Sequence, residues 1–409
     1  MAAHPFTTIE PNVSPGWFAA PCPGEGHGVV AAPEYGPAPN GRRRLPLLVK
    51  DVAGLVPGAY QGQGRGNAFL NDLVDADALV HVVDASGRTD SRGVDQGEGG
   101  RGVGDPLGDV GWVRREVHLW VFANARGKWA SVRRRARTAS HESREAVLER
   151  LAGLFSGYQI TKAMVLEGLL AAGLPPHDAV DAQRGVLTWG EGQLHRLVAF
   201  LLRLRFPTVL ALNKADHPDA AAHVARVQEA LGRAEACVPC SALAELRLLR
   251  WRDSGLIDYA EGAAEASARP CAPAAVAAEL EAVRSGVLTS LGSTGVLEAI
   301  SAAVALRAPT FLFPVRDLAS CEGMCPPGRP RGVLATALML RPQSSVEEAF
   351  AALRAAEVAG GELLRAELLV ARAPAPQHRV ARKEERLAAG AQVLRVVTSK
   401  RVAWQKQRN

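Results

Sequence analysis

The sequence is short of aromatic residues and of cysteines. Phe, Trp and Tyr make up 5% of the 409 residues, and the six cysteines are scattered at positions 22, 237, 240, 271, 321 and 325. Such a low cysteine density argues against a small secreted domain held by disulfides. No run of about 18 apolar residues predicts a membrane span, and the first residues lack a signal-peptide pattern. Together these absences predict a cytoplasmic protein without a membrane partner.

The composition is that of a globular protein with a sizeable core. Hydrophobic residues make up 47% of the chain and charged residues 22%, and a length of 409 residues allows two or three domains. The net charge of +6 and the pI of about 9.2 make the protein mildly basic. That balance is compatible with contact to RNA but does not demonstrate it. We expect no DNA partner.

The most informative stretch begins with the apolar run Leu45–Val49, which leads to Asp51 and the turn glycine Gly54. A helical pattern follows at Asn67–Val74, and a second apolar run occupies Ala78–Val83. This order predicts strand, loop, helix and strand, and therefore a parallel sheet unit. A carboxylate at the carboxyl end of a strand can hold Mg²⁺ through water, and the glycine N–H can contact a terminal phosphate. Asp51 and Gly54 are the candidates for these two roles.

A second strand end has the residues needed to recognise guanine. Thr208–Asp216 reads TVLALNKAD, an apolar strand that runs into Asn213, Lys214 and Asp216. The Asp216 carboxylate can accept hydrogen bonds from N1–H and the exocyclic amine of guanine, whereas adenine would leave it unpaired. Asn213 can bridge loops and contact the base edge. The Lys214 stem can lie over the ring.

A third loop follows downstream, where Cys237–Ala242 reads CVPCSA. It predicts a short strand and a turn at Ser241 and Ala242, whose backbone N–H could contact the guanine oxygen. An isolated Asp-x-x-Gly pattern would be weak, because Asp and Gly mark ordinary turns. Three such loops in this order, each after an apolar run, jointly indicate a GTP site.

These segments resemble the Obg-type P-loop GTPases, in the branch that contains the Obg-like ATPase YchF and its archaeal and fungal GTPase relatives. The resemblance covers most of the chain. It is carried by HPFTTIEPNV at 4–13, DVAGLVPGA at 51–59, GRGNAFLNDLVDADALVHVVDASG at 64–87, ALNKAD at 211–216 and SALAE at 241–245. YchF departs from the Asn-Lys-x-Asp pattern and would imply ATP, whereas this chain keeps Asp216, which favours GTP.

The resemblance implies further roles. Thr7 and Thr8 match the first switch segment, so Thr8 is the expected Mg²⁺ ligand together with Asp51; a polar extended segment is the alternative. Leu55 stands where many GTPases have a catalytic Gln, so no catalytic residue is assigned. The branch ends in a small ubiquitin-like TGS domain, a type linked with RNA and ribosome contact, and the C-terminal part here resembles one.

The sequence contains no phosphate-binding loop of the form Gly-x-x-x-x-Gly-Lys-Ser/Thr. In this family that loop precedes the PFTT segment, and it supplies backbone N–H groups and a Lys to the phosphates. Two explanations stay open: an N-terminally truncated sequence, or a relative that has lost catalysis. We favour truncation because the base-reading and switch residues remain intact.

A helical insertion is expected at about 109–175, between the second switch and the base-reading strand. Its VRRRAR segment includes Arg133, Arg134, Arg135 and Arg137. These arginines could contact RNA phosphates, or they could form a solvated helix face. His195 is expected to be an ordinary helix residue.

The two cysteine pairs, Cys237 with Cys240 and Cys321 with Cys325, could together hold a structural zinc only if two domains met. Apolar packing is the preferred interpretation of these cysteines.

The sequence therefore predicts an α/β fold with a mostly parallel P-loop NTPase-type sheet that lacks its first strand and P-loop helix. We expect a GTPase domain over 1–305, a TGS-like β-grasp domain over 306–399 and a basic tail over 400–409. The expected function is GTP binding with Mg²⁺, in a hydrolysis switch linked to ribosome or RNA binding. The alternative is an inactive pseudo-GTPase that acts as an RNA- or ribosome-binding adaptor.

Overall fold

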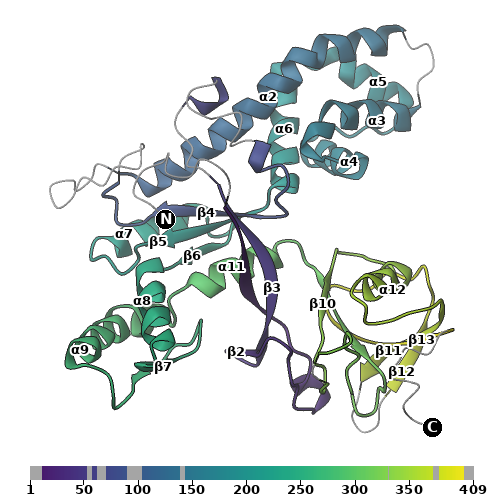
Figure 1. Ribbon diagram of the computed structural model, residues 1–409. Helices are drawn as coiled ribbons and strands as arrows, with labels where there is room; N and C mark the ends of the chain where they lie inside the picture. Colours follow the sequence, from purple (N-terminus) through teal and green to yellow (C-terminus); the bar gives the residue numbers. More distant parts are fainter. Residues whose placement is uncertain are drawn as a thin grey trace. The chain divides into compact units, whose positions relative to one another are not determined.

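The computed structural model describes residues 12–52, 58–61, 71–89, 104–138, 143–329, 331–371 and 377–399 (Figure 1). The predicted site residues Thr8 and Gly54 lie outside these ranges. The chain divides into two compact units, which we describe separately. One comprises Met1–Ser14 and Val49–Cys240, and the other comprises Pro15–Leu48 and Ser241–Asn409.

The first unit contains a parallel sheet of three strands, in the order β4-β5-β6. Its strands are β4 (Leu79–Asp84), β5 (Thr208–Asn213) and β6 (Cys237–Pro239). The apolar runs predicted around Ala78 and Thr208 are both strands. Their inner side chains, including Val83, Leu210 and Leu212, are almost fully buried. This parallel sheet with flanking helices confirms the predicted fold class.

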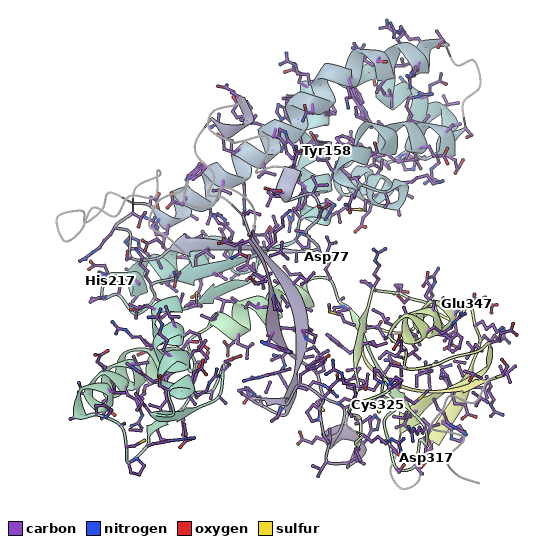
Figure 2. The ribbon with its side chains drawn as sticks, in the orientation of Figure 1. Asp77, Tyr158, His217, Asp317, Cys325 and Glu347 are labelled. Carbon is purple, nitrogen blue, oxygen red and sulfur yellow. The ribbon has the colours of Figure 1, made fainter. Side chains whose placement is uncertain are left out.

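The described part of this unit also contains six α-helices. They are α2 (Pro106–Thr138), α3 (Arg144–Leu154), α4 (Lys162–Ala171), α5 (Ala179–Thr188), α6 (Glu191–Arg205) and α7 (Ala220–Leu231). Helices α2 to α6 share one apolar core, which includes α5 and α6 beyond residue 175. The bounds of the helical insertion stay a prediction. Buried Arg205 ties this core to nearby backbone, donating to the carbonyls of Tyr158 at 2.8 Å and Ala76 at 2.7 Å. Figure 2 labels Tyr158, and also Asp77, which follows Ala76 in the sequence.

The strand that ends at Asp51 departs from the prediction. It is β3 (Arg42–Asp51), and it lies in a separate sheet of order β1-β3-β2, with β1 (Asn12–Ala20) and β2 (Pro37–Ala38). The expected parallel unit of β3 with β4 is therefore wrong for the strands that the structure describes.

A local turn explains this pairing. Asn40 and Gly41 have φ values of 59° and 65°, and the Arg42 N–H donates to the Pro39 carbonyl at 3.3 Å. Two successive left-handed residues make the tight turn that joins antiparallel strands, and Asn-Gly is its preferred sequence. β2 and β3 pair accordingly, with Ala38 opposite Arg42. Closing this short hairpin costs less chain entropy than pairing with a distant strand. The Asn40-Gly41 pair is the signal in the sequence that predicts this hairpin.

The C-terminal part of the second unit is a five-stranded sheet packed on one helix, in the order β10-β9-β13-β11-β12. Its elements are β9 (Thr310–Val315), β10 (Leu338–Leu340), α12 (Val346–Ala355), β11 (Leu363–Ala371), β12 (Gln377–Ala381) and β13 (Gly390–Thr398). β13 runs parallel to β9 and antiparallel to β11. Ser345 caps helix α12, since its hydroxyl accepts from the Glu348 N–H at 3.1 Å. A mixed sheet packed on one helix is compatible with the predicted β-grasp, and the TGS-like assignment stays a prediction.

The remaining α-helices and strands of this unit lie between residues 242 and 305. They are α8 (Ala242–Asp253), β7 (Ile257–Tyr259), β8 (Ala266–Ala268), α9 (Ala274–Val283), α10 (Thr289–Leu291) and α11 (Val296–Ala305). All but α11 contribute to one small apolar core. Ile300 and Val304 of α11 pack instead against the core that contains Phe313.

By length and composition alone, Ala274–Ala305 could cross a membrane, with a mean hydropathy of 1.4. Half of its most apolar 18-residue window is buried inside the protein, and Gly292 and Gly295 interrupt the stretch with φ values of 78° and 75°. These are features of a core segment.

Arg43 joins the hairpin strand β3 to the C-terminal residues of the same unit. Its side chain is fully buried, and it donates to the carbonyls of Leu334, at 2.5 Å, and Ala335. Its guanidinium lies 5.2 Å from the centre of the Phe313 ring. Burial lowers the pKa of Arg43. The contacts thus place residues 15–48 in one core with residues beyond 305. The boundary at 305 itself stays a prediction.

Candidate functional site

The carboxyl edge of the parallel sheet brings two predicted regions together. Asp84 at the end of β4 lies opposite Asn213 at the end of β5, and the Ala85 N–H donates to the Asn213 carbonyl at 2.8 Å. Ligands of open α/β sheets bind outside the carboxyl ends of the strands. This edge is therefore the candidate functional site.

Asp84 is the centre of a hydrogen-bond network at this edge. Its carboxylate accepts from the Lys214 ammonium at 2.6 Å, from the Ser86 N–H at 2.9 Å and hydroxyl at 2.6 Å, and from the Thr89 hydroxyl. Burial works to raise the pKa of Asp84, but the bonds from Lys214, Ser86 and Thr89 outweigh it and leave the pKa below its ordinary value. The group is therefore a stable anion that holds Lys214 in place.

Lys214 begins a tightly bonded turn. It has a φ of 61°, a left-handed conformation that side chains other than Gly, Asn and Asp rarely adopt. Its carbonyl accepts from the N–H of His217 at 3.0 Å, and Figure 2 labels that histidine. The turn is also bonded to the end of β6, because the Ala215 N–H donates to the Cys240 carbonyl at 3.0 Å. Strain held by surrounding bonds is characteristic of functional turns.

Asp216 lies in this turn with its side chain exposed. It makes no hydrogen bond or ion pair with the residues that the structure describes. Its two carboxylate oxygens are therefore available to a ligand, in contrast to those of Asp84. The structure thus separates two acids by role: one organises the edge, and the other presents free acceptors.

Ser241 and Ala242 belong to the second unit, where they open helix α8. Ser241 is fully buried, and its hydroxyl accepts from the Ala244 N–H at 3.2 Å as a helix cap. The Ser241 N–H donates to the Thr294 carbonyl at 2.8 Å. A base contact made by this turn therefore has to come from another of its backbone groups.

Asp51 is exposed at the end of β3 and has no ion pair within the described part of the chain. It and Asp216 follow strands of different sheets, contrary to the expected common sheet. The described residues contain no group of three or more His, Cys, Asp or Glu arranged to hold a metal. The Mg²⁺ roles of Thr8 and Asp51 stay predictions.

Two residues of this edge, Asp84 and Thr89, were missed by sequence reasoning. The available signal was a second Asp at a strand end, followed by Ser86 and a glycine. Gly87 has a φ of 68°, and a Cβ added there would lie 2.3 Å from Cε1 of His223. Glycine is thus required where the loop passes against helix α7.

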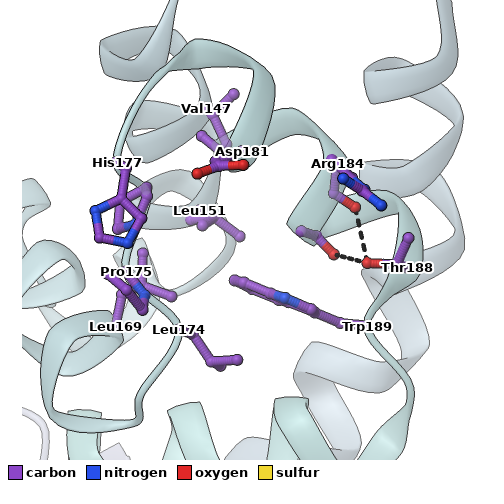
Figure 3. A pocket seen from close by; sticks show the side chains of 13 residues that line it. Val147, Leu151, Leu169, Leu174, Pro175, His177, Asp181, Arg184, Thr188 and Trp189 are labelled. Atoms are coloured by element: carbon purple, nitrogen blue, oxygen red, sulfur yellow. Dashed lines mark hydrogen bonds between the residues drawn. The ribbon is translucent and has the colours of Figure 1, made fainter.

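A cavity of about 360 Å³ lies elsewhere, between α3, α4 and α5 (Figure 3). Leu151, Leu174 and Trp189 supply apolar walls, and His177 and Arg184 also line it. It lies among helices and not at the strand ends, and we assign it no part in the candidate site.

A parallel sheet with flanking helices, carrying Asn213, Lys214 and Asp216 at its carboxyl edge, defines the class of nucleotide-binding α/β proteins with a GTPase-type fold. Residues 211–317 match the family model described as "Obg-like GTPase YGR210-like, G4 motif-containing domain". Together with the similarity to a relative that is 35% identical over 75% of its own length, this match shows that the chain belongs to the Obg-like GTPase family.

The relatives carry corresponding names. The chain is 35% identical over 328 residues to the uncharacterized GTP-binding protein C428.15 of Schizosaccharomyces pombe, covering 77% of this chain and 75% of that protein. It is 34% identical over 258 residues to the uncharacterized GTP-binding protein MJ1332 of Methanocaldococcus jannaschii, covering 63% and 60%. A weaker similarity, 27% over 175 residues, covers 41% of this chain and 43% of the ribosome-binding ATPase YchF of Haemophilus ducreyi.

The fold is also that of a solved structure. A GTP binding protein from Pyrococcus horikoshii OT3 superposes with a TM-score of 0.64 at 24% identity, covering 96% of this chain and 94% of that one. This likeness supports the predicted fold class.

Proposed function

We propose that the protein binds guanine nucleotides and that Asp216 selects the base. The observation that carries the proposal is the exposed, unbonded Asp216 carboxylate in a turn held rigidly at the strand edge. Guanine offers two neighbouring donors, N1–H and the exocyclic amine, to such a carboxylate. Adenine offers neither in that place, so binding it would leave the acid desolvated and unpaired.

Lys214 supports the same proposal. Its ammonium is fixed by Asp84 at 2.6 Å while its side chain keeps 43% of its surface exposed. A stem held at one end offers a preorganised apolar strip for the face of a base, at less entropic cost than a free lysine. Asn213 is the last residue of strand β5, directly before Lys214, and can contact the base edge. Ser241 and Ala242 would support the base from their turn.

The finer proposal is a switch driven by GTP and Mg²⁺. Thr8 and Asp51 would hold the metal, and the Gly54 N–H would contact the γ-phosphate. Hydrolysis would then release these segments and change affinity for a partner. Because the 409-residue sequence contains no phosphate-loop pattern, we expect the phosphates to contribute less affinity than in a GTPase that has one.

Calorimetry on the 409-residue protein tests base selection directly. GTP and GDP with Mg²⁺ should bind more tightly than ATP and ADP, by a factor on the order of 10² or more if the unpaired acid sets the difference. Equal affinities for guanine and adenine nucleotides would refute the assignment of Asp216. Complete absence of nucleotide binding would favour the second candidate, a non-hydrolysing adaptor.

An arginine-rich surface on helix α2 favours an RNA or ribosomal partner for either candidate. Arg134, Arg135 and Arg137 are exposed, and the helix contains no acidic residue after Glu116. Burial and then the Arg135 charge lower the pKa of Arg150 on helix α3, as expected for like charges held close together. None of these three exposed arginines has an acidic partner within the described residues. The surface therefore presents uncompensated positive charge, which phosphates would neutralise.

Salt dependence of RNA binding tests this surface. Replacing Arg134, Arg135 and Arg137 with Ala should weaken binding of a single-stranded RNA. The slope of log K against log salt is negative, and its magnitude should fall by about 2, near 0.7 for each lost phosphate contact. Arg250→Ala, on the exposed side of helix α8 in the other unit, serves as the matched control. If the triple variant has the same slope as the wild type, these arginines do not contact phosphate.

A further inference from the structure

A carboxyl group buried beneath the Ser241 turn has no part in the function described so far. Glu245 lies in the first turn of helix α8 and is 7% exposed. It has no ion-pair partner among the residues that the structure describes. We propose that Glu245 is a positioning residue that fixes the backbone of the Ser241–Ala242 turn for contact with the guanine oxygen. This inference rests on the proposed function and names how one side of the base is read.

The hydrogen bonds form a continuous path from the acid to the turn. One oxygen of Glu245, Oε2, accepts from the Tyr259 hydroxyl at 2.7 Å and from the Thr294 hydroxyl at 2.5 Å. Thr294 is fully buried, and its carbonyl accepts the Ser241 N–H at 2.8 Å. Thr294 therefore holds the acid with its side chain and the turn with its backbone. Removing the acid would free the threonine that orients the turn.

A second segment supports the acid from the opposite end. The Tyr259 hydroxyl donates to Glu245 and accepts from the Gly262 N–H at 3.3 Å. Gly262 has a φ of 78°, and a Cβ there would lie 2.6 Å from Cδ2 of Leu297. The loop between β7 and β8 is thus packed closely against helix α11. The frame around Glu245 joins three segments that are distant in sequence, so it has little freedom to relax.

The electrostatic setting is unusual for a purely structural acid. Burial raises the pKa of Glu245, the nearby charges of Glu261 and Glu298 raise it further, and the bonds from Thr294 and Tyr259 oppose them. Burying an acid without a cation disfavours its charged form, and an apolar residue could fill the same volume without that penalty. What an apolar residue could not do is accept both hydroxyl hydrogens. The hydrogen-bonding geometry is therefore the feature that the acid supplies.

The geometry provides a conservative variant. Because both donors reach the same oxygen, the single carbonyl oxygen of Gln can accept both bonds. Glu245→Gln should therefore retain the position of the turn, whereas Glu245→Met, of similar length, should lose it. Ser301→Ala is the matched control. It removes a buried hydroxyl of the same unit that donates to the Leu297 carbonyl at 2.6 Å and accepts from the Ala19 N–H at 3.1 Å.

Two nucleotide pairs separate the contacts to the base. The affinity ratio of GDP to 6-thio-GDP reports the contact with the guanine oxygen, and that of GDP to IDP reports the Asp216 contact with the amine. Glu245→Met should bring the ratio of GDP to 6-thio-GDP affinity close to one and leave the ratio of GDP to IDP affinity unchanged. Glu245→Gln should keep the wild-type ratio of GDP to 6-thio-GDP affinity. A residue that only stabilised the fold would alter neither ratio. If Glu245→Met keeps the wild-type first ratio, the inference is wrong.

Amide hydrogen exchange distinguishes failure of this inference from failure of the proposed function. Without any nucleotide, Glu245→Met should accelerate exchange at Ser241 at least tenfold relative to Ser301→Ala. Should the wild type bind no nucleotide, the proposed function fails and exchange alone still decides whether Glu245 positions the turn. If Glu245→Met does not fold, Thr294→Val removes only the hydroxyl contact and should change both readouts in the same direction. Unchanged exchange in the folded variants would overturn the inference.

Discussion

At the scale of single residues, two aspartates of one sheet edge differ in their surroundings. The Asp84 side chain is 15% exposed and accepts from Lys214, whereas Asp216 is exposed and unbonded in the described structure. A partly exposed ion pair contributes at most about 1 kcal/mol to stability. The effect of the Asp84–Lys214 pair is therefore mainly to fix the lysine, and the left-handed backbone at Lys214 shows that the turn is held against its local preference.

His81 on strand β4 makes stability depend on pH. Burial and then the positive charge of Arg114 lower the pKa of His81 to about 4. The unfolded chain, with a pKa near 6.5, therefore binds the proton more readily, so stability is full above about pH 6.5 and is lost as the pH falls towards 4. The loss should be at most about 3 kcal/mol. Urea unfolding at pH 7.5 and 4.5 measures it, and His81→Leu should flatten the dependence. An equal loss in wild type and variant would exclude His81 as its source.

At the scale of elements, strand β4 has an edge that no described strand covers. It pairs with β5 on one side only, and Val80 and Val82 remain 41% and 36% exposed. An open strand edge with apolar side chains is a template for pairing with another chain. Among the described strands, this edge therefore presents unpaired N–H and C=O groups beside exposed valines, which favours self-association.

Replacing Val80 and Val82 with Lys tests this edge. Charged side chains on an open edge oppose pairing between copies, so the double variant should self-associate less in light scattering at high protein concentration. Val180→Lys, which removes an exposed valine on helix α5, is the matched control. Nucleotide affinity should be unchanged, because neither valine is assigned to the base site. Equal scattering in all three proteins would show that the edge is not adhesive.

The elements that were predicted correctly are those specified by local pattern. Strands β4 and β5 follow from apolar runs, which require only neighbouring residues. The partner of β3 was predicted wrongly because pairing is decided elsewhere in the chain, here by the turn at Asn40 and Gly41. β12 (Gln377–Ala381) was missed because its side chains are mostly exposed, which leaves no apolar alternation to detect.

At the scale of the whole molecule, sequence order and compact units differ. Residues 15–48 share a core with residues beyond Ser241, through contacts such as those of the buried Arg43 side chain. A prediction that follows the chain cannot find such a core, because its two parts are separated by about 200 residues of intervening sequence. The same limit applies to the site. Asn213, Lys214 and Asp216 were found from a local motif, whereas Asp84, 130 residues before Lys214, was not.

The central claim is that Asp216 recognises guanine. The most direct test is whether substitution of Asp216 changes the preferred nucleotide from GDP to XDP. In Asp216→Asn, the amide can donate to the carbonyl that xanthine has in place of the guanine amine. The wild type should prefer GDP to XDP by a factor on the order of 10², and the variant should reverse that preference. Glu229→Gln, an exposed acid of helix α7, should behave as the wild type. A GDP to XDP ratio that is the same in Asp216→Asn as in the wild type would contradict the account.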